Sequence, residues 1–124
     1  MVAVKAVFDT NILVDYLNGQ PQAAEEFALY PVRLISQITW MEILVGCKEK
    51  QEEQEVRQFL ETFEITPIDQ PIAEAAVQLR KTHRLRLPDA IILATADTQG
   101  ALLVTRDTKA FSPELPGIRV PYRL

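Results

Sequence analysis

The chain has 124 residues, 48% of them hydrophobic, which is enough for one ordinary domain with a core of its own. Its 13 Lys and Arg against 17 Asp and Glu give a net charge of −4, which excludes binding to nucleic acid by overall charge alone. The single cysteine, Cys47, excludes an internal disulfide, and no apolar run approaches the roughly 20 residues that span a bilayer. We therefore expect one domain over residues 1–124, in the reducing cytoplasm and without a membrane partner.

Hydrophobic periodicity predicts strands and helices that alternate along the chain. In chain order, we expect a strand at 3–8, helices at 11–18 and 21–29, a strand at 32–35, and helices at 36–48 and 49–61. There follow a strand at 64–68, helices at 71–82 and 89–98, a strand at 102–105, one helical turn at 108–111 and a strand at 118–121. This alternation predicts an α/β fold in which helices flank a mostly parallel sheet of about 4–5 strands.

Residues suited to helix ends support these boundaries. Pro21 fits the first position of a helix, and Ser36 is a good N-terminal cap for the helix that follows it. Gly19 and Gly100 stand where helices should stop, because glycine readily adopts the left-handed conformation that ends a helix.

Two acidic residues directly follow predicted strands. Asp9 comes between the first strand and the first helix, and Asp107 follows the strand at 102–105 in the same way. Parallel strands bring their carboxyl ends to one edge of a sheet, where open α/β sheets bind ligands. Each residue also has a plain structural interpretation, since Asp caps helices and stabilises turns. Thr10 could cap the first helix equally well, which would leave Asp9 available for a ligand.

Two further acids lie in predicted helices. Glu42 is the only charged residue in the stretch 38–46 and shares a helix face with Ser36 and Thr39, so it could face either water or a half-buried site. Asp89 follows Pro88 in the first turn of a helix, where the helix dipole alone favours an acid by roughly 0.3–1 kcal/mol. Neither position is strong support on its own.

The four acids gain significance as a set. Carboxylate oxygens are the ligands that Mg²⁺ and Mn²⁺ prefer, and a divalent-cation site points to phosphate chemistry. Without these four, the remaining 13 acids would equal the 13 Lys and Arg, so bound cations would cancel most of the net charge. Repulsion among close carboxylates should raise their apparent pKa values in the metal-free protein.

Four segments together resemble the PIN-domain family, specifically the VapC-like toxins of type II toxin–antitoxin systems. They are VFDTNILVDYL (7–17), ISQITWMEILVG (35–46), LPDAIILATA (87–96) and LVTRDTKAF (103–111). The resemblance implies a PIN-like α/β/α sandwich over the whole chain. It also implies a Mg²⁺- or Mn²⁺-dependent endoribonuclease with one or two ions per site. The implied catalytic and metal-binding residues are Asp9, Glu42, Asp89 and Asp107, supported by Asn11, Thr105 and Ser36.

One position departs from the family pattern. Relatives often carry an acid immediately before the Phe that ends the fourth segment, and this chain has Ala110 before Phe111. Asp107 would then supply the fourth carboxylate alone, with less direct metal contact and reduced activity as the expected consequence.

The resemblance also implies a mechanism. Asp9 and Asp89 would hold the first ion with Glu42 nearby, and Asp107 would help a second ion or position a water molecule. One ion would lower the pKa of a bound water, and the other would stabilise the leaving 3′-oxygen. This predicts in-line hydrolysis of RNA that leaves 5′-phosphate and 3′-hydroxyl ends.

The basic segment 80–86 leads directly into Asp89. It could be a solvated helix end, where cations favour the C-terminal dipole, or it could hold phosphates that flank the scissile bond, and the two are compatible. The expected RNA contacts are Arg80, Lys81, Arg84, Arg86 and, beside the proposed site, Arg106. The resemblance implies two protein partners as well: a second copy of the chain, forming a homodimer, and an antitoxin whose tail binds near Tyr16, Leu17 and the stretch 25–30.

Two other functions remain open. An inactive PIN domain could bind RNA or a partner protein without catalysis, and Ala110 is compatible with that. A phosphatase or phosphotransfer domain could use Asp9 as its acceptor, but the dehalogenase-type pattern requires a second Asp at position 11, which is Asn here.

Overall fold

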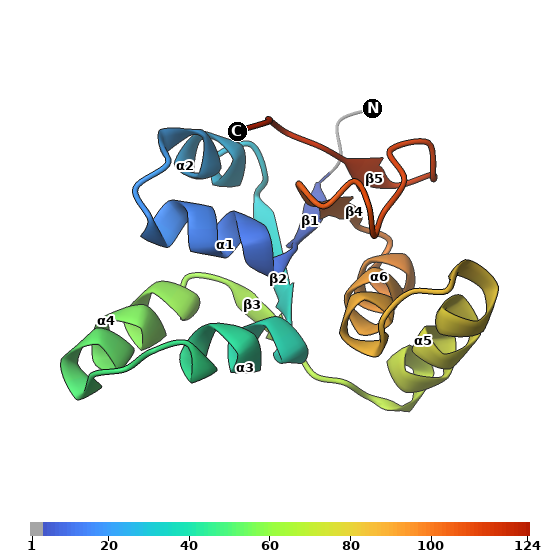
Figure 1. The fold of residues 1–124 in the computed structure, drawn as a ribbon, viewed down its shortest axis with the longest axis horizontal. Helices are drawn as coiled ribbons and strands as arrows, with labels where there is room; N and C mark the ends of the chain where they lie inside the picture. Colours follow the sequence, from blue (N-terminus) through green and yellow to red (C-terminus); the bar gives the residue numbers. More distant parts are fainter. Residues whose placement is uncertain (1–3) are drawn as a thin grey trace.

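A computed structural model describes residues 4–124, built around a five-stranded sheet (Figure 1). All neighbouring strands are parallel, in the order β3-β2-β1-β4-β5. The strands are β1 (Lys5–Phe8), β2 (Val32–Ser36), β3 (Glu64–Thr66), β4 (Leu102–Val104) and β5 (Ile118–Arg119). The predicted parallel sheet flanked by helices is confirmed.

Helices cover both faces of the sheet (Figure 1). On one side lie α1 (Thr10–Leu17), α2 (Pro21–Phe27), α3 (Gln37–Val45) and α4 (Lys50–Leu60), and on the other lie α5 (Gln70–His83) and α6 (Leu87–Gln99). Side chains alternate along β1 as the strand period requires. Phe8 packs with the aromatic core beneath α1, α2 and α4, whereas Val7 packs with the mostly aliphatic core beneath α5 and α6.

Several elements are shorter than predicted. The helix predicted at 36–48 ends at Val45, and a separate helix, α4, starts at Lys50. β3 stops at Thr66 and β5 at Arg119, because Pro67 and Pro121 lack the N–H that a sheet ladder needs. The predicted turn at 108–111 is present, closed by the Phe111 N–H on the Asp107 carbonyl at 3.0 Å. Residue 3, predicted to begin the first strand, lies outside the described residues.

The predicted helix ends are mostly confirmed. Ser36 caps α3, its hydroxyl accepting a hydrogen bond from the Ile38 N–H at 3.2 Å. Gly19 and Gly100 have φ values of +84° and +63°, so both use the left-handed conformation that glycine permits. The exception is α1, which is capped by Asp9 and not by Thr10.

The sheet topology brings two predicted site residues together. β1 and β4 are parallel neighbours, with Phe8 opposite Val104 in register. Asp9 and Thr105 therefore leave the sheet side by side, and the Asp9 N–H donates to the Val104 carbonyl at 2.9 Å. Within residues 4–124, none of the helices combines the length and apolar character that crossing a membrane requires.

Candidate active site

One pocket of about 340 Å³ collects all four predicted acids. Asp9 enters it from the end of β1, Glu42 from α3, Asp89 from the first turn of α6, and Asp107 from the loop after β4. Each comes from a different element, and the residues span almost 100 positions of sequence. The pocket lies where the carboxyl ends of β1 and β4 meet the starts of α1 and α6, as expected for a parallel sheet.

Asp9 is the most firmly held of the four. Its side chain is buried, Oδ1 accepts from the Thr10 N–H at 2.8 Å, and Oδ2 accepts from the Thr105 hydroxyl at 2.7 Å. Asn11 Nδ2 donates to the same Oδ2 at 3.4 Å. Asp9 is therefore both the cap of α1 and a member of the acidic pocket. The expectation that Thr10 would free Asp9 from capping is wrong, because the Thr10 hydroxyl is turned toward Glu42.

The pKa of Asp9 is raised from 3.8 to about 6, and burial of the carboxyl group is the largest cause. Hydrogen bonds from Thr105 and Thr10 oppose this rise, and the negative charges of Asp89 and Asp107 add to it. The expected rise in pKa is thus confirmed in direction, although repulsion between carboxylates is the smaller contribution.

Glu42 sits at the exposed edge of the pocket. Its Oε1 accepts a hydrogen bond from the Thr10 hydroxyl at 2.8 Å, and that hydroxyl lies 3.1 Å from Thr39 Oγ1. The predicted polar face of α3 is therefore buried at Ser36 and Thr39 and open to solvent at Glu42. Ser36 is not among the residues that line the acidic pocket, and its hydroxyl caps α3.

Asp89 and Asp107 complete the acidic set. Burial raises the pKa of Asp89, the charge of Arg86 lowers it, and the charges of Asp107 and Glu42 raise it further. Asp107 also stabilises its own turn: its N–H donates to Thr105 Oγ1 at 2.9 Å, and its Oδ1 accepts from the Ala110 N–H at 3.0 Å. One carboxylate oxygen of Asp107 thus already accepts a hydrogen bond from the backbone of its own turn, at Ala110.

The chemistry of this pocket fits a hard divalent cation. Within residues 4–124, no group of three or more His, Cys, Asp or Glu side chains is arranged to hold a metal ion by itself. Mg²⁺ does not need such a cage, since it usually keeps several waters and is held through one or two carboxylates and a substrate phosphate. Asp9 and Asp89 could supply those carboxylates, with Glu42 and Asp107 contributing negative charge.

The predicted basic residues fall into two groups. Arg106 lines the acidic pocket but is held in a partly buried ion pair with Asp15, and Arg80 donates to the Leu85 carbonyl at 2.7 Å, which fixes the turn after α5. Lys81, Arg84 and Arg86 are exposed, and Arg86 lines the acidic pocket next to Asp89.

Comparison with known proteins decides the family. The PIN-domain family pattern matches residues 6–112, most of the chain. The chain belongs to the PIN-domain family.

Solved structures of similar fold agree with this assignment. A chain of a toxin–antitoxin complex from Klebsiella pneumoniae has a TM-score of 0.90 and 48% identity, covering 96% of this chain and 99% of that one. DNA-bound VapBC from Salmonella typhimurium has a TM-score of 0.79 and 26% identity, covering 94% and 96%. FitAcB from Neisseria gonorrhoeae has a TM-score of 0.75 and 25% identity, covering 96% and 99%. No curated protein matches the sequence.

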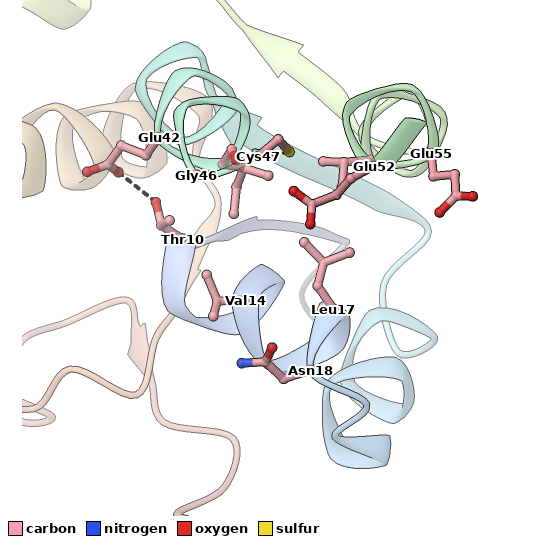
Figure 2. A pocket seen from close by; sticks show the side chains of 11 residues that line it. Thr10, Val14, Leu17, Asn18, Glu42, Gly46, Cys47, Glu52 and Glu55 are labelled. Atoms are coloured by element: carbon pink, nitrogen blue, oxygen red, sulfur yellow. Dashed lines mark hydrogen bonds between the residues drawn. The ribbon is translucent and has the colours of Figure 1, made fainter. Parts of the chain in front are cut away.

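A second and larger pocket of this PIN domain adjoins the acidic one (Figure 2). Its volume is about 520 Å³, and it lies between α1, α3 and α4. Val14 and Leu17 point into it from α1, and Glu52 faces them from α4 (Figure 2). Thr10, Val14 and Glu42 line both pockets, so the two are continuous. The surface near Tyr16 and Leu17, where the antitoxin tail is expected to bind, is divided: Leu17 lines this pocket, and Tyr16 lines a smaller one with Phe27 and Phe59.

Two residues connected to the PIN site were not predicted: Asp15, which lines the acidic pocket, and Tyr122, which contacts Asp15. Asp15 is buried and accepts two hydrogen bonds from Arg106, and Tyr122 donates a third. Burial raises the pKa of Asp15, but the hydrogen bonds from Arg106 and Tyr122 outweigh it and leave the pKa below its ordinary value. The sequence contained a hint of the role of Asp15, because it is the one acid in an apolar helix and lies one turn after Asn11. The sequence contained no such hint for Tyr122, because its contact with Asp15 spans 107 positions.

Proposed function

We propose that this PIN domain is a divalent-metal-dependent endoribonuclease that acts as the toxin of a toxin–antitoxin pair. The observation that carries the proposal is the single pocket in which the four predicted carboxylates meet at the carboxyl edge of a parallel sheet. The membership of the PIN family and the similarity to a chain of a toxin–antitoxin complex at 48% identity support it.

The site residues would have different roles in binding the ion. Asp9 and Asp89 would bind the ion, and Glu42 and Asp107 would add the negative charge that draws it in. A bound Mg²⁺ or Mn²⁺ supplies an activated water and stabilises the negative charge that develops on the phosphate. Thr105, Thr10 and Asn11 orient the Asp9 carboxylate through hydrogen bonds from two sides. A fixed carboxylate lowers the cost of reorganisation when the ion and the substrate arrive.

Substrate binding would fall to the basic residues beside the acids. Arg86 lines the pocket next to Asp89 and is the residue best placed to hold a phosphate that flanks the cleaved bond. Lys81 and Arg84 are exposed at the end of α5 and would extend that contact along the RNA. Arg80 and Arg106 already have protein partners, which makes them weaker candidates than the sequence alone indicated.

The larger pocket is the proposed docking place of the antitoxin. Its apolar side chains include Val14, Leu17, Ile43 and Val56, and Glu42, Glu52 and Glu55 provide acidic groups. That combination favours a partner segment with apolar side chains and at least one basic one. Because the pocket continues into the acidic site, such a segment would also restrict access to the four acids. The proposal includes a homodimer, for which exposed Met41 and Val45 on α3 offer apolar surface.

A metal-dependent cleavage assay tests the proposal. Purified protein is incubated with structured and unstructured RNA in Mg²⁺, Mn²⁺ or EDTA, beside Asp89→Asn. We expect cleavage that requires the metal, leaves 5′-phosphate ends, and falls at least about 100-fold in the variant, since a metal ligand is lost. Asp97→Asn is the matched control, because Asp97 lies on the same helix and outside the pocket.

The alternative is a PIN domain that binds RNA or protein without cutting. Ala110 in place of an acid and the lack of a preformed three-ligand group in residues 4–124 favour it. RNA binding that survives Asp89→Asn, together with no cleavage in any metal, would support this alternative and contradict the nuclease.

A further inference from the structure

A buried carboxylate on α1 is held by groups from the far end of the chain. Arg106 Nε and Nη2 donate to the Asp15 carboxylate at 2.5 and 2.7 Å, and the Tyr122 hydroxyl donates to Asp15 Oδ2 at 2.8 Å. Asp15 is buried, and the Arg106 side chain is only 29% exposed. We call these three residues the Asp15 set. The two parallel bonds fix the plane of the guanidinium as well as its position.

The Asp15 set is attached to the active site through the backbone of Arg106. Thr105, the residue before it, donates to Asp9 Oδ2 and accepts the Asp107 N–H, at 2.7 and 2.9 Å. The Arg106 N–H donates to Asn11 Oδ1 at 3.3 Å. The segment 105–107 therefore carries one hydrogen-bond partner of Asp9 and one site carboxylate, and the guanidinium between them is anchored on Asp15.

We propose that Asp15 and Tyr122 are positioning residues of the active site, which act through Arg106 to hold Thr105 and Asp107 in place. The expected effect on metal binding rests on the proposed metal-dependent function. If segment 105–107 were displaced, Asp107 would be misplaced and Asp9 would lose the hydrogen bond from Thr105 that holds it. Groups that orient metal ligands typically change metal affinity by about 10- to 100-fold when they are removed. The tail after β5, which crosses toward α2 in Figure 1, thereby becomes part of the site.

The fold contains a matched control whose side chains contact none of the four acids, although the Arg119 carbonyl accepts the Thr105 N–H at 3.0 Å through the backbone. Arg119 donates to the Glu26 carboxylate at 2.6 and 2.9 Å, and the Tyr30 hydroxyl donates to Glu26 at 3.0 Å. Glu26 is as buried as Asp15. Arg119 lies on β5, whose ladder with β4 holds it independently of Glu26. These residues, the Glu26 set, repeat the chemistry of the Asp15 set without contacting the four acids.

The informative variants remove one hydroxyl each. Tyr122→Phe deletes the bond to Asp15 and keeps the ring, and Tyr30→Phe does the same in the Glu26 set. Asp15→Asn is the stronger change, because it leaves the Arg106 guanidinium without its counter-charge beside the acidic pocket. Arg106→Lys keeps the positive charge but loses the two-bond contact, so it should behave like Tyr122→Phe or worse.

Amide hydrogen exchange in the metal-free protein tests the positioning directly. We expect exchange of the Arg106 and Asp107 amides to speed up about tenfold in Tyr122→Phe, because the segment that carries them is held less firmly against the acceptors Asn11 Oδ1 and Thr105 Oγ1. In Tyr30→Phe these two amides should exchange as in the wild type. Equal exchange at both amides in wild type and Tyr122→Phe would overturn the proposal.

Calorimetric titration with Mn²⁺ tests the consequence for the site. The Kd for Mn²⁺ should rise about tenfold in Tyr122→Phe and more in Asp15→Asn, and stay unchanged in Tyr30→Phe. An equal Kd in Tyr122→Phe and Tyr30→Phe would show that the Asp15 set is only structural and overturn the inference. If the wild type itself bound no Mn²⁺, the proposed function would fail, and the exchange rates alone would decide whether the segment is held by Tyr122.

Discussion

At the scale of single residues, Asp9 joins a structural role to the proposed chemical one. The same carboxylate caps α1 through Oδ1 and receives the Thr105 hydroxyl on Oδ2. Capping and ligand binding are usually offered as competing explanations for an acid after a strand, yet the two oxygens allow both at once. The cap also explains why the carboxylate can stay buried, because its hydrogen bonds offset part of the cost of removing it from water.

The metal-free protein should lose stability as the pH rises through about 6. Burial, supplemented by the charges of Asp89 and Asp107, raises the pKa of Asp9 from 3.8 to about 6 against the hydrogen bonds from Thr105 and Thr10. The folded protein therefore holds this proton more tightly than the unfolded chain. The resulting stabilisation is complete below 3.8 and is lost as the pH rises through 6. The two values differ by about 2, and each pKa unit corresponds to about 1.4 kcal/mol, so the change is about 3 kcal/mol.

Urea unfolding in EDTA between pH 4 and 8 measures this effect as a difference between wild type and Asp9→Asn. Other carboxylates titrate in both proteins and cancel in the comparison, whereas the amide at position 9 does not titrate. We expect the wild type to lose about 3 kcal/mol more than the variant over this range. Parallel pH profiles for the two proteins would contradict the raised pKa.

At the scale of elements, the site depends on where helices start. α1 begins at the end of β1, and α6 places Asp89 in its first turn. α3 begins directly after β2, capped by Ser36, and presents Glu42 from its second turn. Helix starts carry partial positive charge from the dipole, which favours the carboxylates at α1 and α6. Two of the four acids are thus supported by the backbone of the helix they start.

Replacing Ser36 with Ala should destabilise the protein and leave the metal site intact. The Ser36 hydroxyl is fully buried and accepts the Ile38 N–H at 3.2 Å, so its loss leaves a helix-terminal donor unsatisfied. Loss of an N-terminal cap costs about 1 kcal/mol. Chemical denaturation measures this cost, and Ser112→Ala, in an exposed turn with a similar bond, is the control that should change little. A loss of Mn²⁺ affinity in Ser36→Ala would instead give Ser36 a direct role in the site.

The sequence predicts the elements and the four acids because both follow from local rules. Strand ends and helix starts can be recognised from neighbouring residues, and parallel pairing then brings Asp9 and Asp107 to the same edge. The contacts that hold the site in place follow from tertiary packing instead. Tyr122 meets Asp15 across 107 positions, and nothing in the tail distinguishes this tyrosine from any other. Arg106 illustrates the same limit. From the sequence alone, an arginine beside an acidic site suggests a phosphate contact, and only the structure shows that it pairs with the buried Asp15.

At the scale of the whole molecule, the acidic pocket couples metal binding to folding. The four acids come from the residue after β1, from α3, from α6 and from the loop after β4, so the pocket forms only when both faces of the sheet are covered. The unfolded chain cannot present these acids together. An ion that binds the folded protein must therefore stabilise the fold as a whole, by mass action.

Mn²⁺ should accordingly raise the melting temperature. At a concentration of about 100 times Kd, the gain is about 2.7 kcal/mol, and for a domain of this size each kcal/mol corresponds to about 3–5 °C, so we expect a shift of about 10 °C. The shift should be larger at pH 7 than at pH 5, because the Asp9 proton competes with the ion below its pKa of about 6. Scanning calorimetry of wild type, Asp89→Asn and Asp97→Asn measures it. Asp97→Asn should keep the full shift and Asp89→Asn should lose most of it, whereas equal shifts in all three would locate the bound ion outside the acidic pocket.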